Sequence, residues 1–494
     1  MVEIPLMVAM HDAIIAPAMC DVVDSATGAI LLSDQSALTG LVAVRVLPQR
    51  RWVFRAQWSG KAVFAKVFLG AQAEKYASRD AQGVRWLTQA GLATPALLWQ
   101  GHSADQRASI LIYTAIAPAD NADVLYQTLP PEQGLLLLKQ LVQTLAAQHV
   151  AGLVQTDLHL KNFLLSDNKV WSLDGDGIQK HTLNQRQAYR QLAELISKVQ
   201  VLDQHAWVAP LLAAYDQARG WQATLLASTL LTLAKKMKAQ EVERYVTRKI
   251  FRTCSDVAWQ QTSQSAQAVS AAGGLHATDL PALEVAMHVG KVLKPGNTCT
   301  VVHTHLQDEA VVIKRYNIKN WLHGLSRAWR PSRAAASWRN AHRLQYYGML
   351  TPQPLLMYEQ RYCGMRGRAY FVSAYSPWPD ALTFFQKCTD SDMRERVIHQ
   401  LVTLCYQWYL LKVSHGDLKA SNLQVTDQGE IVVIDLDSMQ QHRRTQMALR
   451  AHAKDVRRLL QNWKQDTSLY NALLKSFSLI YQDHTPLRLA GISL

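Results

Sequence analysis

The segment His415-Gly-Asp417-Leu-Lys-Ala-Ser-Asn422-Leu-Gln-Val decides the interpretation of the whole chain. Asp417 is followed five positions later by Asn422, and the next apolar run ends at Asp435. One such pattern means little, because short polar patterns arise constantly by chance. Its weight depends on whether the rest of the chain repeats it.

The first half of the chain does repeat it. This copy reads Asp157-Leu-His-Leu-Lys-Asn162-Phe-Leu-Leu, and the following apolar stretch ends at Asp174. Both copies have one more Asp two positions later, at Asp176 and Asp437, which is either a metal ligand or a turn residue at a strand end. An ordered set that recurs in one chain indicates two copies of one domain.

The same order of elements precedes each copy. Residues 52–68 are predicted to form a β-hairpin of aromatic and β-branched residues that carries Lys66, and residues 298–316 form another that carries Lys314. A helix-like stretch ending in Gly and Pro follows each hairpin, then more strands and helices. The sequence therefore predicts α+β domains, each with a small antiparallel β-sheet lobe and a mainly helical lobe.

The two predicted domains span residues 1–225 and 276–494. Residues 226–275 between them are predicted to be a connecting helix, which alternates apolar and basic positions, and then a flexible linker. The linker is expected over residues 262–274, where small polar residues, Ala and Gly predominate.

Four side chains of each copy suit phosphoryl transfer, which asks a protein chiefly for positioning and charge neutralisation. A strand Lys holds phosphate oxygens, and a loop Asp orients the acceptor hydroxyl and takes its proton. An Asn and a strand-end Asp bind Mg²⁺ through oxygen. These four are Lys66, Asp157, Asn162 and Asp174 in the first copy, and Lys314, Asp417, Asn422 and Asp435 in the second.

Each of these residue types also has an ordinary structural explanation. A strand Lys often has an exposed tip, a loop Asp often caps its own backbone, and an Asp at a strand end is often a turn residue. The full set occurs twice, in the same order, and each copy is preceded by the same series of predicted elements. This favours two tandem protein-kinase-like bilobal domains that use ATP and Mg²⁺.

Composition places the protein among ordinary globular chains. Hydrophobic residues make up 49% and charged residues 18% of the 494 residues. No apolar run has the length of a membrane span, and the N-terminus lacks the basic segment of a secretory signal. The six cysteines form no CxxC pair, which indicates neither a disulfide framework nor a zinc site. We therefore expect a cytoplasmic protein.

The net charge of +14 indicates an anionic partner, such as a nucleotide, an anionic lipid, a phosphorylated glycan or nucleic acid. Much of the excess lies in two segments, residues 235–252 and residues 327–343. Either is explained equally well as a solvated helical face. Nucleic acid is not expected, because no known nucleic-acid-binding module is recognisable.

With these motifs in place, the sequence resembles the lipopolysaccharide core kinases of the Kdo kinase and heptose kinase type, a branch of the protein-kinase-like fold. The resemblance covers most of both halves. It is most specific in the second, at residues 312–320, 330–344, 351–354 and 415–422; in the first, residues 157–165 match best. It implies a two-lobed fold, ATP with Mg²⁺, and phosphorylation of an inner-core sugar hydroxyl on the cytoplasmic side.

The chain departs from the family pattern at two points. The catalytic loop of the family usually opens with His; the second half has His415, but the first has Gln155. The helix after the hairpin normally supplies an acid that pairs with the strand Lys. In the first half this implies Asp80, with Glu74 as the alternative. In the second half the same offset falls on Ser337, with Asn340 nearby, so a carboxylate from elsewhere, such as Glu359, would have to substitute.

The sequence leaves three functions open. The first is an ATP-dependent kinase of a heptose or Kdo hydroxyl, acting on the lipopolysaccharide core attached to lipid A. The second is a pseudokinase-type binding protein of envelope assembly, and the third is a kinase of another small hydroxyl acceptor. Arg330 and Arg333 are candidates for gripping substrate phosphates, because guanidinium groups match phosphate oxygens bidentately. Any contact with the inner membrane would be peripheral.

Overall fold

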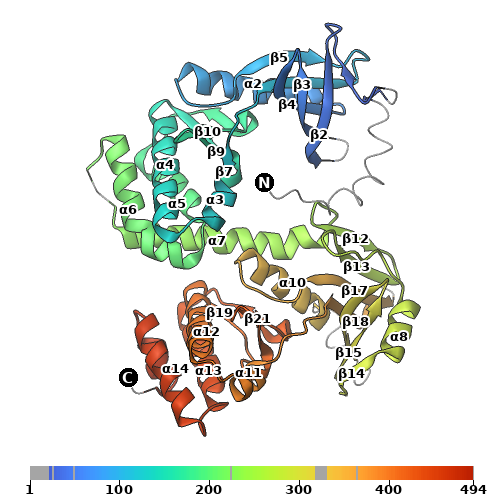
Figure 1. Ribbon diagram of the computed structural model, residues 1–494, viewed down its shortest axis with the longest axis vertical. Coiled ribbons are helices and arrows are strands. Elements are labelled where there is room, and N and C mark those ends of the chain that lie inside the picture. Colours follow the sequence, from blue (N-terminus) through green and yellow to red (C-terminus); the bar gives the residue numbers. More distant parts are fainter. Residues whose placement is uncertain are drawn as a thin grey trace. The chain divides into compact units, whose positions relative to one another are not determined.

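The computed structural model describes residues 22–24, 27–47, 50–222, 225–296, 298–317, 331–362 and 365–492. It divides into two compact units. The first unit comprises Met1–Val199 and Asp203–Met237, and the second comprises Gln200–Leu202 and Lys238–Leu494. The long helix α7, Ala227–Arg248, includes the point at which the chain finally leaves the first unit (Figure 1). The domain boundaries given above remain predictions.

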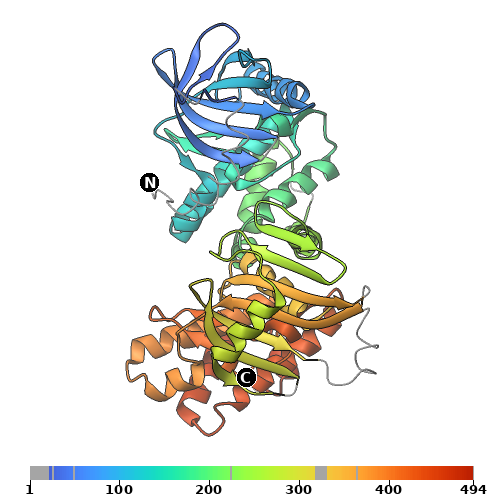
Figure 2. The same ribbon diagram turned by 90° about the vertical axis from the view of Figure 1, so that its right-hand side faces the viewer.

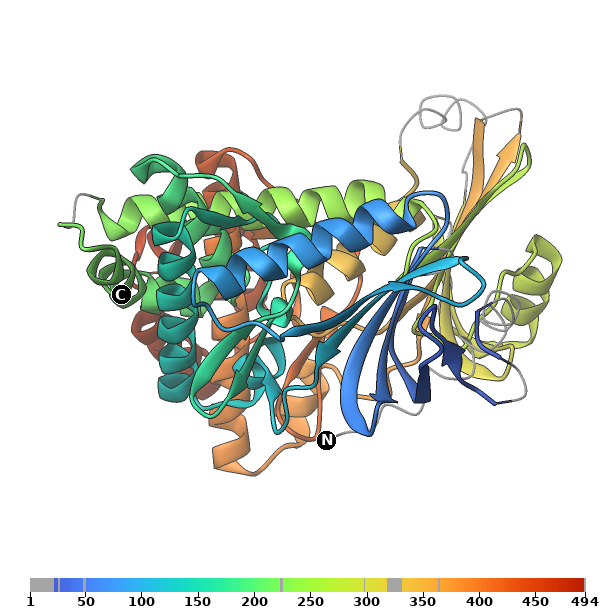
Figure 3. The ribbon, with the colours of Figure 1, turned by 90° about the horizontal axis from the view of Figure 1, so that it is seen from above.

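The first unit begins with an antiparallel six-stranded sheet and one helix, α2, Ala73–Gln89. The helix lies along one face of the sheet (Figure 3). The strand order is β1-β2-β3-β4-β6-β5, and the strands are β1 (Ile30–Leu31), β2 (Ala37–Leu47), β3 (Arg51–Trp58), β4 (Lys61–Leu69), β5 (Leu97–His102) and β6 (Ala108–Thr114).

The predicted hairpin that carries Lys66 is confirmed as β3 and β4. Its two-residue turn places Ser59 at φ 50° and Gly60 at φ 74°, the left-handed conformation that matches the twist of a tight hairpin. Side chains alternate along β4, so that Ala65 and Val67 enter the core on one face while Phe68 packs with α2 on the other. Lys66 shares the face of Phe68.

The rest of the first unit is mainly helical, with short strands between the helices. Its core is mainly aliphatic and is centred on α4, which contains the long apolar stretch of the first half. The helices are α3 (Ala122–Thr128), α4 (Pro131–Val150), α5 (Gln185–Ile196), α6 (Val201–Arg219) and the start of α7. The strands are β7 (Asp120–Asn121), β8 (Leu153–Gln155), β9 (Phe163–Ser166), β10 (Lys169–Ser172) and β11 (Ile178–Lys180).

The second unit repeats this organisation around an antiparallel seven-stranded sheet of order β12-β13-β17-β18-β16-β15-β14. The hairpin that carries Lys314 is confirmed as β15 and β16. The strands are β12 (Val257–Gln261), β13 (Ser265–Ser270), β14 (Lys291–Lys294), β15 (Cys299–Leu306), β16 (Glu309–Tyr316), β17 (Pro354–Tyr362) and β18 (Met365–Ala374).

The expected flexible linker over residues 262–274 is contradicted by this sheet. The stretch forms much of a hairpin instead, and β13 lies between β12 and β17, pairing Ser265 with Gln360. Ala266, Ala268 and Val269 are buried. The pairing of β13 with β17 joins residues about 90 positions apart in sequence, and local composition cannot show such a partner.

Two helices cover the two faces of the second sheet. Helix α8, Leu280–Val289, packs with the core that contains Ile313, whereas α10, Arg333–Tyr346, packs with Phe371 on the opposite face. Figure 2 shows α8 lying over the sheet. Because side chains alternate along a strand, Lys314 shares the face of α10.

The remainder of the second unit is helical, with a core continuous with the α10 face. Its helices are α11 (Ala381–Lys387), α12 (Ser391–Leu411), α13 (Thr445–Gln461), α14 (Thr467–Ile480) and α15 (Thr485–Leu489), and its strands are β19 (Val413–Ser414), β20 (Leu423–Val425), β21 (Ile431–Val433) and β22 (Gln440–Gln441). Among the described residues of the chain, no helix is both long and apolar enough to cross a membrane.

Candidate active sites

In the first unit, Lys66 is held by a buried carboxylate of α2. Its Nζ donates to Asp80 Oδ2 at 2.6 Å, and the Tyr113 hydroxyl donates to Asp80 Oδ1 at 2.5 Å. Asp80 has no exposed surface. Burial raises the pKa of Asp80, against the opposing charge of Lys66. Burial lowers the pKa of Lys66, but the carboxylates around it outweigh burial and raise that pKa overall.

Asp174 supplies the second carboxylate around this lysine. Lys66 Nζ lies 3.4 Å from Asp174 Oδ1, and Arg51 Nη1 lies 3.8 Å from the same oxygen. Burial opposes ionisation of Asp174, yet the two positive charges outweigh it and lower its pKa. The structure thus brings together three residues that were predicted from separate parts of the sequence, with Asp174 as a charged oxygen donor.

The loop residues Asp157 and Asn162 are joined to each other. The Asn162 amide donates to the main-chain carbonyl of Asp157 at 2.8 Å, which leaves the amide oxygen as an acceptor. The carbonyl of Asn162 accepts from the main chain of Leu173 at 3.0 Å, next to Asp174. Before the loop, Gln155 is buried and pairs with Ile178. The pairing of β8 with β11 therefore holds the start of the loop at Gln155, the position at which the family usually has a histidine.

Two glycines let α2 approach the chain after Asp174. A Cβ atom on Gly83 would lie 2.0 Å from the carbonyl oxygen of Gly175, and one on Gly175 would lie 2.1 Å from the carbonyl oxygen of Asp80. Only glycine fits such contact between two main chains. The contact fixes α2 against the loop, so that Asp80 and Asp174 converge on one lysine.

The second unit arranges its lysine differently. Lys314 Nζ donates to Asp435 Oδ1 at 2.8 Å, and Asp435 is the only acid among the described residues that the structure pairs with it. Burial opposes ionisation of Asp435, but Lys314 outweighs it and lowers the Asp435 pKa. Ser337, at the offset of Asp80, is buried and lies 2.9 Å from the Tyr316 hydroxyl.

The suggested substitute, Glu359, does not pair with Lys314. Its carboxylate is nearly buried and lies 3.5 Å from Arg361 and 3.4 Å from Arg366. Glu359 was proposed from its approximate position in sequence, whereas its side chain is directed by the register of β17. This expectation is therefore wrong.

Asn340 joins α10 to the loop after Asp435. Its amide donates to the carbonyls of Leu436, at 2.8 Å, and Met439, at 2.9 Å, and its own oxygen accepts from Arg343 at 2.7 Å. The side chain is 4% exposed. The second unit thus connects its helix to the loop through the hydrogen bonds of a buried asparagine, where the first unit uses close contact between two glycines.

The strand-end aspartates also differ in backbone conformation. Asp435 is left-handed, with φ 62° and ψ 58°, whereas Asp174 is extended, with φ −111° and ψ 94°. A left-handed residue other than glycine costs about 1–3 kcal/mol and persists only where its surroundings hold it. Such strain gathers at functional sites, and at Asp435 the Lys314 ion pair and the loop bonds of Asn340 supply the restraint.

The catalytic-loop histidine of the second unit is held by an acid that the sequence analysis missed. Asp455 on α13 accepts from the main chain of His415 at 2.6 Å and of Gly416 at 3.1 Å. His415 is fully buried, and its Nε2 lies 3.0 Å from the carbonyl of Ile434. Burial lowers the His415 pKa, which keeps the ring neutral at pH 7. Gly416 has φ 81° and no space for a side chain, because a Cβ would lie 2.7 Å from a carbonyl.

Asp417 follows directly and has two cationic neighbours. Arg458 pairs with Oδ1, and Lys419 lies 3.6 Å from Oδ2. As in the first unit, the loop asparagine, Asn422, donates to the main-chain carbonyl of this aspartate, at 2.9 Å. No local pattern identifies Arg458, because it lies on α13 and reaches the loop only in the folded chain.

The additional aspartates, Asp176 and Asp437, pair with arginines. Arg79 on α2 contacts Asp176, and Arg333 on α10 lies 2.5 Å from Asp437. The structure therefore favours a bracing role between helix and loop over metal binding for both residues. Arg333 is engaged inside the second unit, and Arg330 lies outside the described residues.

The donor set fits magnesium only in combination with phosphates. The described residues hold no cluster of three or more His, Cys, Asp or Glu side chains that could bind a metal. Each unit offers one carboxylate, from Asp174 or Asp435, and one amide oxygen, from Asn162 or Asn422. Mg²⁺ in phosphotransferases commonly takes one or two protein oxygens and completes its shell with substrate phosphates and water.

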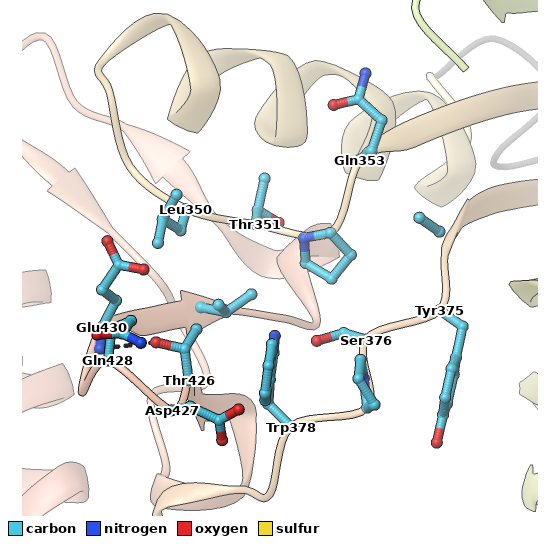
Figure 4. Close-up of a pocket in the computed structure, with 14 residues that line it drawn as sticks. Leu350, Thr351, Gln353, Tyr375, Ser376, Trp378, Thr426, Asp427, Gln428 and Glu430 are labelled. Atoms are coloured by element: carbon cyan, nitrogen blue, oxygen red, sulfur yellow. Dashed lines mark hydrogen bonds between the residues drawn. The ribbon is translucent and has the colours of Figure 1, made fainter. Parts of the chain in front are cut away.

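A larger hollow of the second unit lies apart from these residues. It has a volume of about 470 Å³ and is lined by three segments, 350–353, 374–378 and 426–432 (Figure 4). None of the candidate site residues lines it, so size alone does not identify the site. In the first unit, a smaller hollow of about 170 Å³ includes Arg51 and Asp176 and therefore adjoins the Lys66 cluster.

Comparisons with known proteins agree with this geometry. Residues 49–215 and 285–479 match the model of the Lipopolysaccharide kinase (Kdo/WaaP) family. No curated protein matches. Among solved structures, that of vaccinia related kinase 3 is similar over 44% of this chain and 76% of its own, with 10% identity and a TM-score of 0.26, too low to support any argument. The two matched regions cover well over half of the chain and the predicted fold class is confirmed, so the protein belongs to the lipopolysaccharide kinase (Kdo/WaaP) family in two tandem α+β kinase-like copies.

Proposed function

We propose that the protein transfers the γ-phosphate of ATP, with Mg²⁺, to a heptose or Kdo hydroxyl of the lipopolysaccharide inner core. Membership of a lipopolysaccharide kinase family supports a kinase of core sugars. The observation that most supports a working site is the cluster of Lys66, Asp80 and Asp174 in the first unit. A lysine held between one buried and one partly exposed carboxylate is positioned in advance to neutralise phosphate charge.

In the first unit, the proposed roles follow from the contacts. Lys66 binds phosphate oxygens and Asp80 keeps it in place. Asp174 and Asn162 hold Mg²⁺, which neutralises the phosphates when bound. Asp157 accepts the proton of the sugar hydroxyl while the hydroxyl oxygen bonds to the γ-phosphorus and ADP leaves. The bond from the Asn162 amide to the Asp157 carbonyl keeps the proposed metal ligand and the proposed base in one frame.

The second unit has corresponding candidates in Lys314, Asp417, Asn422 and Asp435. Its loop is better braced, through His415 and Asp455. Its lysine is less well braced, because Lys314 pairs with the proposed metal ligand itself. If the Asp435 carboxylate binds Mg²⁺ instead of Lys314, only the nucleotide phosphates remain to neutralise the charge of Lys314. We therefore expect this unit to bind nucleotide and metal together or not at all.

A pseudokinase role for the second unit is the alternative that a specific observation favours. Lys314 lacks a helix carboxylate, and Asp417 is engaged by Arg458 and Lys419. Both ion pairs must open before the Asp417 carboxylate can face a substrate hydroxyl. Under this alternative, the second unit binds the core sugars and the first unit phosphorylates them.

The setting of the reaction follows from the substrate. We propose that the protein acts in the cytoplasm, at the inner face of the inner membrane, where the core sugars attached to lipid A are accessible. We propose no role for nucleic acid, and the excess positive charge is explained by phosphorylated glycolipid and nucleotide.

The test is transfer of labelled γ-phosphate from ATP to purified, dephosphorylated core lipopolysaccharide. Wild type, Asp157→Ala, Asp417→Ala and the double variant are compared, with Asp167→Ala as a matched control in an exposed turn. Label that disappears only in the double variant establishes two working sites. Label that disappears in one single variant assigns the active unit. The proposal is wrong if wild type binds ATP with Mg²⁺ yet never labels the glycolipid.

A further inference from the structure

The smaller hollow of the first unit is lined by the ends of strands β2, β3 and β4, by α2 and by the loop after Asp174. Its volume is about 170 Å³. Its lining residues are Leu47, Arg50, Arg51, Phe68, Tyr76 and Asp176. Pockets for drug-sized ligands are larger, about 300–1,000 Å³. The hollow therefore suits one small chemical group rather than a whole nucleotide or sugar chain.

Two consecutive arginines line this hollow, and within the described residues neither guanidinium group makes a hydrogen bond. Arg51 lies opposite Phe68 and therefore shares the face of Lys66. Its side chain is 13% exposed, and its guanidinium group lies 3.8 Å from the Asp174 carboxylate. Arg50 pairs with no carboxylate in the described part of the chain; its guanidinium carbon lies over the Tyr76 ring, 4.7 Å from the centre. Each arginine has five N–H donors, so the pair presents many directed donors in one place.

The charges around the hollow and the adjoining Lys66 cluster do not balance. Four cations meet three carboxylates, which are Lys66, Arg50, Arg51 and Arg79 against Asp80, Asp174 and Asp176. Arg79 is matched by Asp176, and its guanidinium group also lies over the Tyr76 ring, 5.5 Å from the centre. Tyr76 thus holds two guanidinium groups beside one ring, although like charges repel each other. An anion in the hollow would offset the excess positive charge.

The corresponding positions of the second unit carry no guanidinium group. The register places Cys299 where the first unit has Arg51, because each lies opposite the residue two positions after its strand lysine. Thr298 precedes Cys299, where Arg50 precedes Arg51. A feature that the shared fold required would recur in both copies. The arginine pair therefore belongs to the site of the first unit and not to the repeated scaffold.

We propose that Arg50 and Arg51 form a subsite that binds a phosphate group next to Lys66. This inference rests on the proposed function, because a phosphotransferase brings phosphate groups to that lysine. Guanidinium groups match phosphate oxygens with paired N–H donors, which a lysine cannot do. The phosphate has one of two sources. It is the terminal phosphate of the nucleotide, or it is a phosphate that the glycolipid acceptor already carries.

The experiment is calorimetric titration of the full-length chain. Lys314→Ala with Asp435→Ala removes the candidate nucleotide site of the second unit, so that only the first unit is measured. In this parent chain, Arg50→Gln with Arg51→Gln removes both charges, and Arg50→Lys with Arg51→Lys keeps them. The control is Arg186→Gln, because Arg186 is exposed on α5 and does not line the hollow.

The probes are ATP and ADP, each with Mg²⁺, and soluble core oligosaccharide with and without its phosphates. Thermal melting confirms that each variant is folded. If the double glutamine variant does not fold, Arg50→Gln alone is titrated with the same probes, because Arg50 is exposed.

The two sources predict different losses. If the subsite holds the terminal phosphate, the glutamine variant should bind ATP about tenfold more weakly or worse, and ADP within about threefold of the parent. If it holds an acceptor phosphate, ATP affinity should stay within about threefold, and only the phosphorylated oligosaccharide should bind about tenfold more weakly or worse. The lysine variant should lose less in either case, because it keeps the charge but not the paired donors.

Three results overturn the proposal. The first is a folded glutamine variant that binds every probe within about threefold of the parent. The second is an equal loss in the Arg186→Gln control, because a general effect of net charge then explains the result. The third is a parent chain that binds no phosphate-bearing probe.

Transfer of labelled phosphate separates this inference from the proposed function, because the titrations measure binding without transfer. If wild type never labels the glycolipid but the glutamine variant loses affinity for one class of probe, the subsite stands and the proposed activity fails. If wild type labels the glycolipid and the glutamine variant binds every probe as the parent does, the activity stands and the subsite fails.

Discussion

Replacing Asp80 by Asn should selectively weaken the first unit. The exchange keeps the shape of a side chain that has no exposed surface, but removes its negative charge. Two donors then compete for a single amide oxygen, because both Lys66 and Tyr113 now donate to the carboxylate. Lys66 retains only the more distant carboxylate of Asp174, at 3.4 Å. We expect the ammonium group to leave the position in which it meets phosphate.

The magnitude follows from these contacts. A hydrogen bond to a charged group contributes about 1.5–3 kcal/mol. Part of that loss is offset, because the buried carboxylate of Asp80 is itself costly to desolvate, as its raised pKa indicates. We therefore expect the unfolding free energy of the first unit to fall by about 2 kcal/mol. The same loss in the transition state corresponds to about a thirtyfold fall in kcat/KM.

The assay uses a chain with Asp417→Ala, so that only the first unit is measured. Initial rates give kcat/KM for ATP, calorimetry gives the affinity for ATP with Mg²⁺, and thermal melting gives stability. The matched control is Ser337→Ala in a chain with Asp157→Ala. Ser337 stands at the corresponding helix position, yet contacts Tyr316 rather than Lys314, so second-unit kcat/KM should change by less than about threefold.

The reasoning fails if Asp80→Asn leaves both nucleotide affinity and kcat/KM within threefold of its parent while the unit remains folded. Lys66 would then be positioned by Asp174 alone, and the two units would not differ in how they hold the lysine. An equal loss in the Ser337→Ala control would point to general packing of the helix rather than to charge.

Three further predictions concern other contacts. Asn340→Ala removes two hydrogen bonds from α10 to its loop. Denaturant titration should show that the unfolding free energy of the second unit falls by about 2–4 kcal/mol. Initial rates should show that kcat falls more than KM changes. Gly83→Ala pushes a methyl group against the main chain of Gly175 and should lower the unfolding free energy by about 1–3 kcal/mol, as thermal melting will show. The control is Gly134→Ala in α4, where a methyl group has room and should raise the unfolding free energy by up to about 1 kcal/mol. Burial lowers the pKa of His452 to about 3, because the folded protein disfavours the charged ring. The unfolding free energy should therefore be unaffected by this residue above pH 6.5 and should fall by about 1.4 kcal/mol per pH unit as the pH drops from 6.5 toward 3. Acid titration should show a smaller fall in His452→Gln.

The predictions that the structure confirms rest on local patterns. The hairpins around Lys66 and Lys314 were predictable because alternating apolar residues and a tight turn encode a strand pair within about 20 residues. The lysine and the strand-end aspartate of each copy meet because the same order of elements brings the same positions together. The ion pairs Lys66–Asp174 and Lys314–Asp435 show this in both units.

The features that sequence reasoning missed depend on distant partners. Asp455 looks like any helical acid until α13 packs beneath the loop of His415. Glu359 was expected near Lys314, but the register of β17 directs it to arginines. Residues 262–274 were expected to be a linker, because small polar residues are typical of linkers and their strand partner lies far along the chain.

By itself, the sequence determined the repeat, the α+β class and the chemical character of the candidate residues, because strand periodicity, turn residues and side-chain ionisation are properties of short segments. The tertiary structure alone decided which charges pair: Lys66 with Asp80 and Asp174, and Lys314 with Asp435 rather than with Glu359. Electrostatic pairing depends on distances of a few ångströms between residues far apart in the chain, and folding alone sets those distances.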